Sequence, residues 1–315
     1  MLIKVAVGSL CHTDGMVSDG IMGTKLPCIA SHEGAGTVVK LGSAVKEFQV
    51  GDRILCSLTY HRCGVCADCI GLERDHQYCS KTGGHNGITR DGSFAEYEIV
   101  DGRECCILPD NLSFQSAAPL ACAGISVVRT FSSLILLLPI LITPFRTSDL
   151  LSNTFVSFFC SKNNLSEKTA DAPIFEWSGL VRADLKSGES IAIIGGGGGL
   201  GHLGVQFAKA LGLKVIAIDA RDEGLHLAKD CGADVVIDAR QSKEKVVEEV
   251  HRVSGGQGAD ATLNVSDHET AAALGAAVTK RHGLLVQIAQ PPEVKIPFVE
   301  LVFRDIRVHG SLIGE

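Results

Sequence analysis

The chain has 315 residues, of which 45% are hydrophobic, so it can bury a sizeable core and is long enough for two domains. Its formal net charge of −7 leaves no basic surface for nucleic acid or anionic lipid, and we expect neither a nucleic-acid nor a membrane partner. With 35 glycines and 5% aromatic residues, the composition suits an α/β enzyme with many tight turns.

The N-terminal third is rich in short β-forming runs. The opening residues, MLIKVAVGSLCHTDG, lack a charged segment followed by a long apolar run, so we expect no signal peptide and a cytoplasmic location. Glycine and aspartate bound three apolar runs that predict strands of a small β-rich domain: 38–42, 51–55 and 94–100.

Four cysteines in this third have the spacing of a metal centre. Cys63, Cys66 and Cys69 follow one another at intervals of three, and Cys79 comes ten positions later. Thiolates at this spacing converge on one tetrahedral zinc ion, and four of them close its shell. The pattern therefore predicts a structural zinc site; the alternative is a set of four free thiols.

A second set of candidate ligands is dispersed. Cys11 opens the run Cys-His-Thr-Asp, His32 stands in Ser-His-Glu-Gly, and Cys122 follows much later. Each is a weak signal alone, since a lone histidine is more often a satisfied core residue. Two cysteines and one histidine together leave one tetrahedral position of a zinc ion open for water or substrate.

A segment of different composition follows, at about residues 128–177. Its apolar run, Ser132 to Ile142, contains Pro139 and is shorter than the ~20 residues that a membrane span needs. We interpret the segment as an insert.

The C-terminal part has the pattern of a dinucleotide-binding unit. A predicted strand at 191–194, a helix at 203–211 and a strand at 214–219 make a βαβ unit with parallel strands. Between the first two, Gly196, Gly198 and Gly201 satisfy G-x-G-x-x-G, which lets the backbone approach a pyrophosphate. Asp219 ends the second strand, where an acid binds ribose hydroxyls and favours NAD over NADP; the alternative is a strand-end turn acid.

In order and spacing, the motifs GSLCHTD, SHEGAGTVV, VGDRI, CGVCADC, DGSFAEY, AAPLACAG and GGGGGLGHLGVQFAKALG resemble those of the zinc-containing medium-chain alcohol dehydrogenases. The resemblance covers residues 1–127 and 178–315. It implies an α/β protein in which a GroES-like, β-rich catalytic domain (1–127) and a doubly wound Rossmann domain (178–315) flank the insert and an active cleft. It also implies a homo-oligomer, either a dimer or a tetramer.

The resemblance also assigns roles to individual residues. It implies two zinc ions per chain, a catalytic one bound by Cys11, His32 and Cys122 and a structural one bound by Cys63, Cys66, Cys69 and Cys79; two cysteines and one histidine are the catalytic set of alcohol dehydrogenase itself. Glu33 is expected beside the catalytic zinc, Asp14 to support the metal site, for instance by orienting His32, and Thr13 to take the alcohol proton. The cofactor is expected to contact His12, Gly196, Gly198, Gly199, Leu200, Gly201 and Asp219.

The chain also departs from the family pattern. Both ends are shorter than usual, Met16 replaces a second relay histidine, and Gly224 replaces a basic residue beyond the ribose acid. We predict a zinc-dependent oxidoreductase that converts an alcohol and NAD⁺ into an aldehyde or ketone and NADH. The alternatives are a polyol or aromatic-alcohol dehydrogenase, and a non-catalytic or poorly folded truncated product of the same family.

Overall fold

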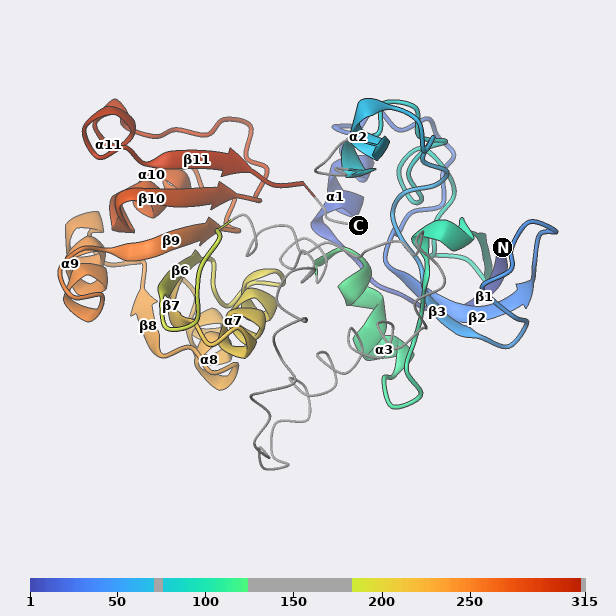
Figure 1. Cartoon of the computed structure of the whole chain (residues 1–315), viewed down its shortest axis with the longest axis horizontal. Helices are drawn as coiled ribbons and strands as arrows, with labels where there is room; N and C mark the ends of the chain where they lie inside the picture. Colours follow the sequence, from blue (N-terminus) through green and yellow to red (C-terminus); the bar gives the residue numbers. More distant parts are fainter. Residues whose placement is uncertain (71–75, 124–182, 313–315) are drawn as a thin grey trace. The chain divides into compact units, whose positions relative to one another are not determined.

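The computed structural model describes residues 1–70, 76–123 and 183–312, which divide into two compact units (Figure 1). The first contains the described residues up to 123, and the second contains residues 183–312. The predicted insert, 128–177, lies outside the described residues. Among the helices that the structure describes, none is long and apolar enough to cross a membrane.

The first unit is built on a five-stranded antiparallel sheet with the strand order β4-β1-β2-β3-β5. The three strands predicted from the sequence are confirmed, and the chain opens directly into a fourth. The strands are β1 (Leu2–Gly8), β2 (Gly34–Lys40), β3 (Arg53–Leu55), β4 (Tyr97–Ile99) and β5 (Cys106–Ile107). Short helices connect them: α1 (His12–Ser18), α2 (Ala67–Ile70), η1 (His76–Tyr78), η2 (Gly102–Glu104), α3 (Phe114–Ala117) and η3 (Ala118–Ala121).

The strands of this unit contribute to two buried clusters, one containing Ile54 and the other containing its neighbour Leu55. Ile3 on β1 pairs with Val38 on β2, and Ile54 on β3 lies in the same cluster. All three side chains are fully buried, whereas Lys4, next to Ile3, is exposed. Burial of three branched side chains contributes roughly 1.5–3 kcal/mol each, before the entropy of ordering them is subtracted.

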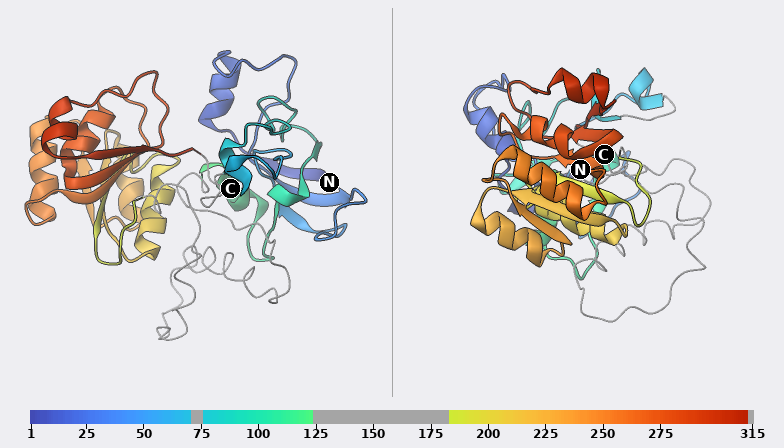
Figure 2. Two further views of the ribbon diagram at one scale, coloured as in Figure 1. Left: turned by 45° about the horizontal axis from the view of Figure 1, so that its top comes forward. Right: turned by 90° about the vertical axis from the view of Figure 1, so that its left-hand side faces the viewer.

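The second unit is a six-stranded, wholly parallel sheet with the order β11-β10-β9-β6-β7-β8 (Figure 2). Its strands are β6 (Ser190–Ile194), β7 (Lys214–Asp219), β8 (Val235–Asp238), β9 (Ala259–Asn264), β10 (Thr279–Gln287) and β11 (Arg307–Gly310). All five residues of β6 are buried, as expected for a strand with neighbours on both sides and helices over both faces.

Helices alternate with these strands: α7 (Gly201–Ala210), α8 (Asp222–Asp230), α9 (Lys243–Val253), α10 (Ala271–Val278) and α11 (Phe298–Phe303). Helix α7 packs beside α8, and α9 beside α10. Strand β6 adjoins both β7 and β9, so the strand order reverses there. In doubly wound sheets, ligands bind outside the carboxyl ends of the strands at this reversal. The predicted glycine run lies at that edge, directly after β6.

Candidate metal centres and dinucleotide loop

Four predicted site residues meet in the first unit. The ligand atoms of Cys11, His32, Glu33 and Cys122 all lie within 4.8 Å of one another. The sulfurs of Cys11 and Cys122 are 3.8 Å apart, although 111 positions separate these residues in the chain. A tetrahedral zinc ion with metal–sulfur bonds of about 2.3 Å places two of its sulfur ligands about 3.8 Å apart. The spacing of the two thiols therefore fits a shared zinc ion.

The histidine of this group provides the second test of fit. His32 is 1% exposed, and both of its ring nitrogens are buried without a hydrogen-bond partner among the described residues. An unsatisfied buried polar atom is costly, and native proteins rarely contain one. A metal ion would satisfy one of these nitrogens. The residues of the group thus fit a zinc ion in the chemistry of their ligand atoms and in the missing hydrogen-bond partners of His32.

The group is electrostatically unusual. Contact with the Cys122 sulfur lowers the pKa of Cys11 to about 3, and the neighbouring His32 acts in the same direction. Burial would lower the pKa of His32, but interaction with Cys11 and with the acids Glu33 and Asp14 raises it. Burial raises the pKa of Glu33 to about 7. Perturbed groups gathered in this way are typical of functional sites.

Asp14 organises the backbone of this centre. Its two carboxylate oxygens accept the backbone N–H groups of Cys11 and Ser31, each at 2.8 Å. Asp14 was expected to support the metal site, for instance by orienting His32; its oxygens hold the backbone at Cys11 and at Ser31, the residue before His32. Asp14 is 7% exposed, so water competes little for these two hydrogen bonds.

The backbone before His32 has a strained turn. Ser31 has a φ of 71°, a value that residues other than glycine, asparagine and aspartate rarely adopt. The Ser31 N–H donates to Asp14, and the Ser31 hydroxyl donates to the Ser9 carbonyl at 2.9 Å. The Ser31 carbonyl accepts a hydrogen bond from the Ser93 N–H at 2.8 Å. A Cβ on Gly92 would lie 2.0 Å from that carbonyl, which explains the glycine in the DGSFAEY motif. These contacts fix the direction in which His32 leaves the turn.

Thr13 and His12 flank the centre at the start of α1. The Thr13 hydroxyl oxygen lies 3.7 Å from the Cys11 sulfur, while His12 is exposed. Ser9, which the sequence analysis did not single out, donates a hydrogen bond from its hydroxyl to Glu33 Oε2. No pattern in the sequence marks Ser9, because its role depends on the pairing of β1 with β2.

The second metal candidate is the predicted four-cysteine group. The sulfurs of Cys63, Cys66, Cys69 and Cys79 all lie within 4.8 Å of one another. The Cys66–Cys79 and Cys63–Cys69 sulfur pairs are 3.8 and 4.0 Å apart, again close to the sulfur spacing around zinc. Such a closed set has no open position for substrate.

Backbone groups favour thiolates in this second group. The N–H groups of Val65 and Cys66 donate to the Cys63 sulfur at 3.4 and 3.3 Å, and the Cys63 N–H donates to the Cys79 sulfur at 3.4 Å. The bond from Val65 is the largest cause of a lowered pKa at Cys63. Since zinc binds thiolates, a turn that supplies N–H donors to sulfur is prepared for the metal.

In the second unit, the glycine run turns tightly between β6 and α7. A Cβ on Gly196 would lie 2.8 Å from Ala217 Cβ on the next strand, and one on Gly201 would lie 2.0 Å from the Gly195 carbonyl oxygen. A Cβ on Gly199 would meet nothing within 4 Å, so this part of the loop faces open space. Gly196 and Gly201, the first and third glycines of G-x-G-x-x-G, are thus needed for packing. The loop leaves room for a pyrophosphate before α7.

Asp219 lies beneath this loop and is tied to it. Its carboxylate accepts the Gly197 N–H at 3.0 Å and pairs with Arg221, whose Nε is 3.2 Å away. Although burial acts in the opposite direction, the Arg221 and Gly197 hydrogen bonds lower the pKa of Asp219. A Cβ on Gly224 would lie 2.5 Å from the carboxylate as it stands here, so Gly224 lets the Asp219 carboxylate take this position. The sequence analysis missed this link between positions 219 and 224.

The two units and their sites define a zinc-binding dehydrogenase of the two-domain type. Residues 1–110 match the family description "Alcohol dehydrogenase GroES-like domain", and residues 199–315 match "Zinc-binding dehydrogenase". An alcohol dehydrogenase of Geobacillus stearothermophilus is 32% identical over 320 residues, which cover 100% of this chain and 77% of the relative. Alcohol dehydrogenase 1 of Emericella nidulans is 28% identical and matches all of this chain and 76% of its own length.

Solved structures agree. The alcohol dehydrogenase of Aeropyrum pernix superposes with a TM-score of 0.74 at 25% identity, covering 100% of this chain and 78% of that one. A target protein from Sinorhizobium meliloti, described as a zinc-binding dehydrogenase bound to NADP, has a TM-score of 0.73 at 25% identity, with 99% and 77% covered. The chain belongs to the zinc-containing medium-chain alcohol dehydrogenase family and is an oxidoreductase. Zinc and a nicotinamide dinucleotide are the cofactors of this family.

Proposed function

We propose that the protein oxidises an alcohol to an aldehyde or ketone with NAD⁺, using one zinc ion held by Cys11, His32 and Cys122. The observation that carries this proposal is the convergence of two thiols and an unsatisfied, buried histidine on one point. Three protein ligands leave a tetrahedral position for the substrate oxygen. A zinc ion bound there would supply Lewis-acid activation of that oxygen, and bound NAD⁺ would accept the hydride.

The chain's own residues have separate tasks in this proposal. Asp14 and Ser31 hold the ligand-bearing backbone, so that the metal is bound without further rearrangement. Thr13, whose hydroxyl oxygen is 3.7 Å from the Cys11 sulfur, takes the proton of the alcohol. Glu33, kept close by the Ser9 hydroxyl, serves as the alternative carboxylate ligand.

The proposal includes a preference for NAD over NADP. In it, Asp219 binds the adenosine ribose hydroxyls, and its fixed negative charge repels a 2′-phosphate. The pyrophosphate takes the open side of the glycine loop at Gly198, Gly199 and Leu200, with His12 as a further phosphate contact. Four thiolates of Cys63, Cys66, Cys69 and Cys79 bind a second, structural zinc ion.

An assay of NADH formation over a panel of primary, secondary, aromatic and polyol alcohols tests the reaction. We expect turnover that a zinc chelator abolishes and added zinc restores. Thr13→Ala should lower kcat about 10²-fold or more, whereas Thr13→Ser, which keeps the hydroxyl, should retain most of it. An active enzyme that is indifferent to zinc removal, or equal activity of the two variants, would refute the assigned roles.

We further propose self-association through the β11 edge of the parallel sheet. All four residues of β11 are exposed, and none of the residues of the adjoining helix α11 is buried. Val302 and Phe303 on α11 are 69% and 67% exposed. An edge strand of the described sheet beside exposed apolar side chains is suited to association with a second copy. Light scattering should give a dimer or tetramer that Val302→Glu dissociates; a wild-type monomer would contradict this.

A further inference from the structure

The segment that carries the four cysteines has little apolar anchoring of its own. Among its described residues (61–70 and 76–80), the large apolar side chains point to solvent: Val65 and Ile70 are both 68% exposed, and Tyr78 is 42% exposed. Of the described residues between 61 and 80, only Cys69 and Cys79 are buried. Burial of large apolar side chains therefore contributes little to the attachment of the described part of this segment.

An ion pair connects the segment to the core of its unit. Arg62 directly precedes Cys63, and its Nε lies 2.8 Å from Glu104 Oε1; the two side chains are 12% and 2% exposed. Glu104 ends η2 and precedes Cys105, which is 2% exposed in the cluster that contains Ile3. Through this pair the backbone at Cys63 is tied to the core of the sheet.

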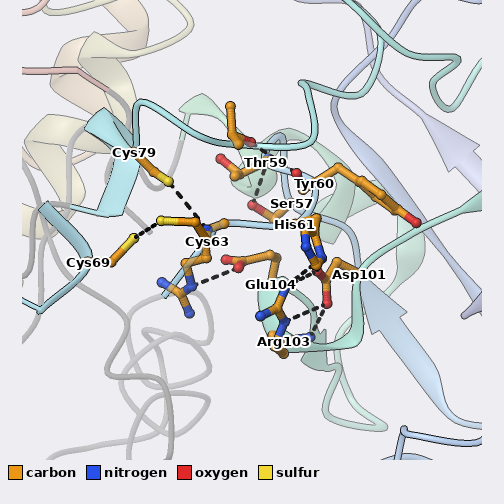
Figure 3. A network of polar contacts seen from close by, with 12 residues as sticks. Ser57, Thr59, Tyr60, His61, Cys63, Cys69, Cys79, Asp101, Arg103 and Glu104 are labelled. Carbon is orange, nitrogen blue, oxygen red and sulfur yellow. Dashed lines mark hydrogen bonds and ion pairs between the residues drawn. The ribbon is translucent and has the colours of Figure 1, made fainter. Parts of the chain in front are cut away.

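A parallel contact lies beside it at the surface. His61 Nδ1 is 3.0 Å from an Arg103 terminal nitrogen, and the same guanidinium pairs with Asp101 at 2.7 Å (Figure 3). Consecutive residues 61 and 62 thus contact consecutive residues 103 and 104. We call the Arg62–Glu104 pair the buried layer and the His61–Arg103–Asp101 contact the exposed layer, since the side chains of His61 and Arg103 are 65% and 49% exposed. Exposed pairs contribute little, so the buried layer dominates the attachment.

We propose that Arg62 and Glu104 form a latch that positions Cys63 within the four-cysteine centre and slows loss of its metal. The inference rests on the proposed second zinc ion. Arg62 and Glu104 act as positioning residues: neither touches the metal, and both act through the direction that they give to the chain entering Cys63. With the latch open, Cys63 leaves the other three sulfurs, and the metal is exposed to competing ligands.

The test measures zinc transfer to a chromogenic chelator in full-length protein that carries Cys122→Ser, so that the four-cysteine centre holds the only zinc ion. Adding Glu104→Gln should speed release roughly tenfold or more, the usual effect of removing a residue that orients a metal ligand. The matched control is Asp101→Asn in the same turn, which removes the charge that pairs with Arg103, keeps an acceptor for the Arg103 N–H that Asp101 caps, and should leave the release rate unchanged.

A double variant separates positioning from the cost of an unpaired charge. Arg62→Met with Glu104→Met leaves no buried charge, so it should fold even if Glu104→Gln does not. This double variant should still release zinc faster than the Cys122→Ser parent does. Parent-like release from the double variant, or equal acceleration by Asp101→Asn, would overturn the latch. A Cys122→Ser parent without zinc would instead refute the proposed second zinc ion.

Discussion

Cys11 and Cys122 lie at opposite ends of the first unit's sequence, and yet their sulfurs are 3.8 Å apart. Neither is part of a local metal-binding pattern. Cys11 directly precedes α1 after the first strand, and Cys122 directly follows η3 after the last strand of the sheet. The fold of the whole unit is therefore needed to bring them together. Loss of folding and loss of this metal site should be coupled, because an unfolded chain has no such site.

Asp14 should matter for stability as well as for the site. Asp14→Ala leaves two buried backbone N–H groups, those of Cys11 and Ser31, without their acceptor. We expect a loss of about 3 kcal/mol or more in the free energy of unfolding, measured by denaturant titration. Asp14→Asn keeps one good acceptor and should lose about half as much. A loss below about 1 kcal/mol for the alanine variant would show that water replaces both bonds.

Cofactor choice should depend on the Asp219–Arg221 pair. In the wild type, Arg221 pairs with Asp219 at 3.2 Å. Asp219→Ser removes the charge that repels a 2′-phosphate and leaves Arg221 free to bind that phosphate. The ratio of kcat/KM for NAD to that for NADP should fall about tenfold or more. Adding Arg221→Ala should remove the gain with NADP. An unchanged ratio in Asp219→Ser would mean that this carboxylate does not read the ribose.

Glu98 should make stability depend on pH. It is 4% exposed and bonded to the Ser93 hydroxyl, and burial raises its pKa from the ordinary 4.5 to about 7. Between about pH 4.5 and 7, the folded protein therefore keeps a proton on Glu98 that the unfolded chain loses. The contribution of protonated Glu98 to the free energy of unfolding is full below about pH 4.5. It is lost as the pH rises through about 7.

Glu98→Gln keeps an acceptor for Ser93 but cannot ionise, so it is the matched comparison. Between pH 5.5 and 8, the wild type should lose about 2 kcal/mol of unfolding free energy relative to this variant. Measuring the difference between the two proteins at each pH cancels the titration of zinc ligands. Parallel stability curves for the two proteins would rule out a raised pKa at this position.

The sequence predicted those features that depend on local spacing. The four-cysteine centre and the strand–glycine loop–helix unit are each contained in short stretches, and their predicted elements agree with β6, α7 and β7. The residues themselves suggested Cys11, His32 and Cys122 only weakly, and the family resemblance supplied the roles expected of them. Contacts that join distant positions were not predictable: the Arg62–Glu104 pair has no sequence signature. The same holds for the hydrogen bond between Asp14 and the Ser31 N–H, since 17 positions separate the two residues.

Zinc content per chain tests the account most directly. Elemental analysis of chelator-washed protein should give two zinc ions per chain, because two complete ligand sets are present. Cys122→Ser and Cys79→Ser should each leave one, while Cys231→Ser, at a half-buried thiol outside both sets, should leave two. One zinc ion or none in the wild type, or two in either ligand variant, would contradict the two-centre account.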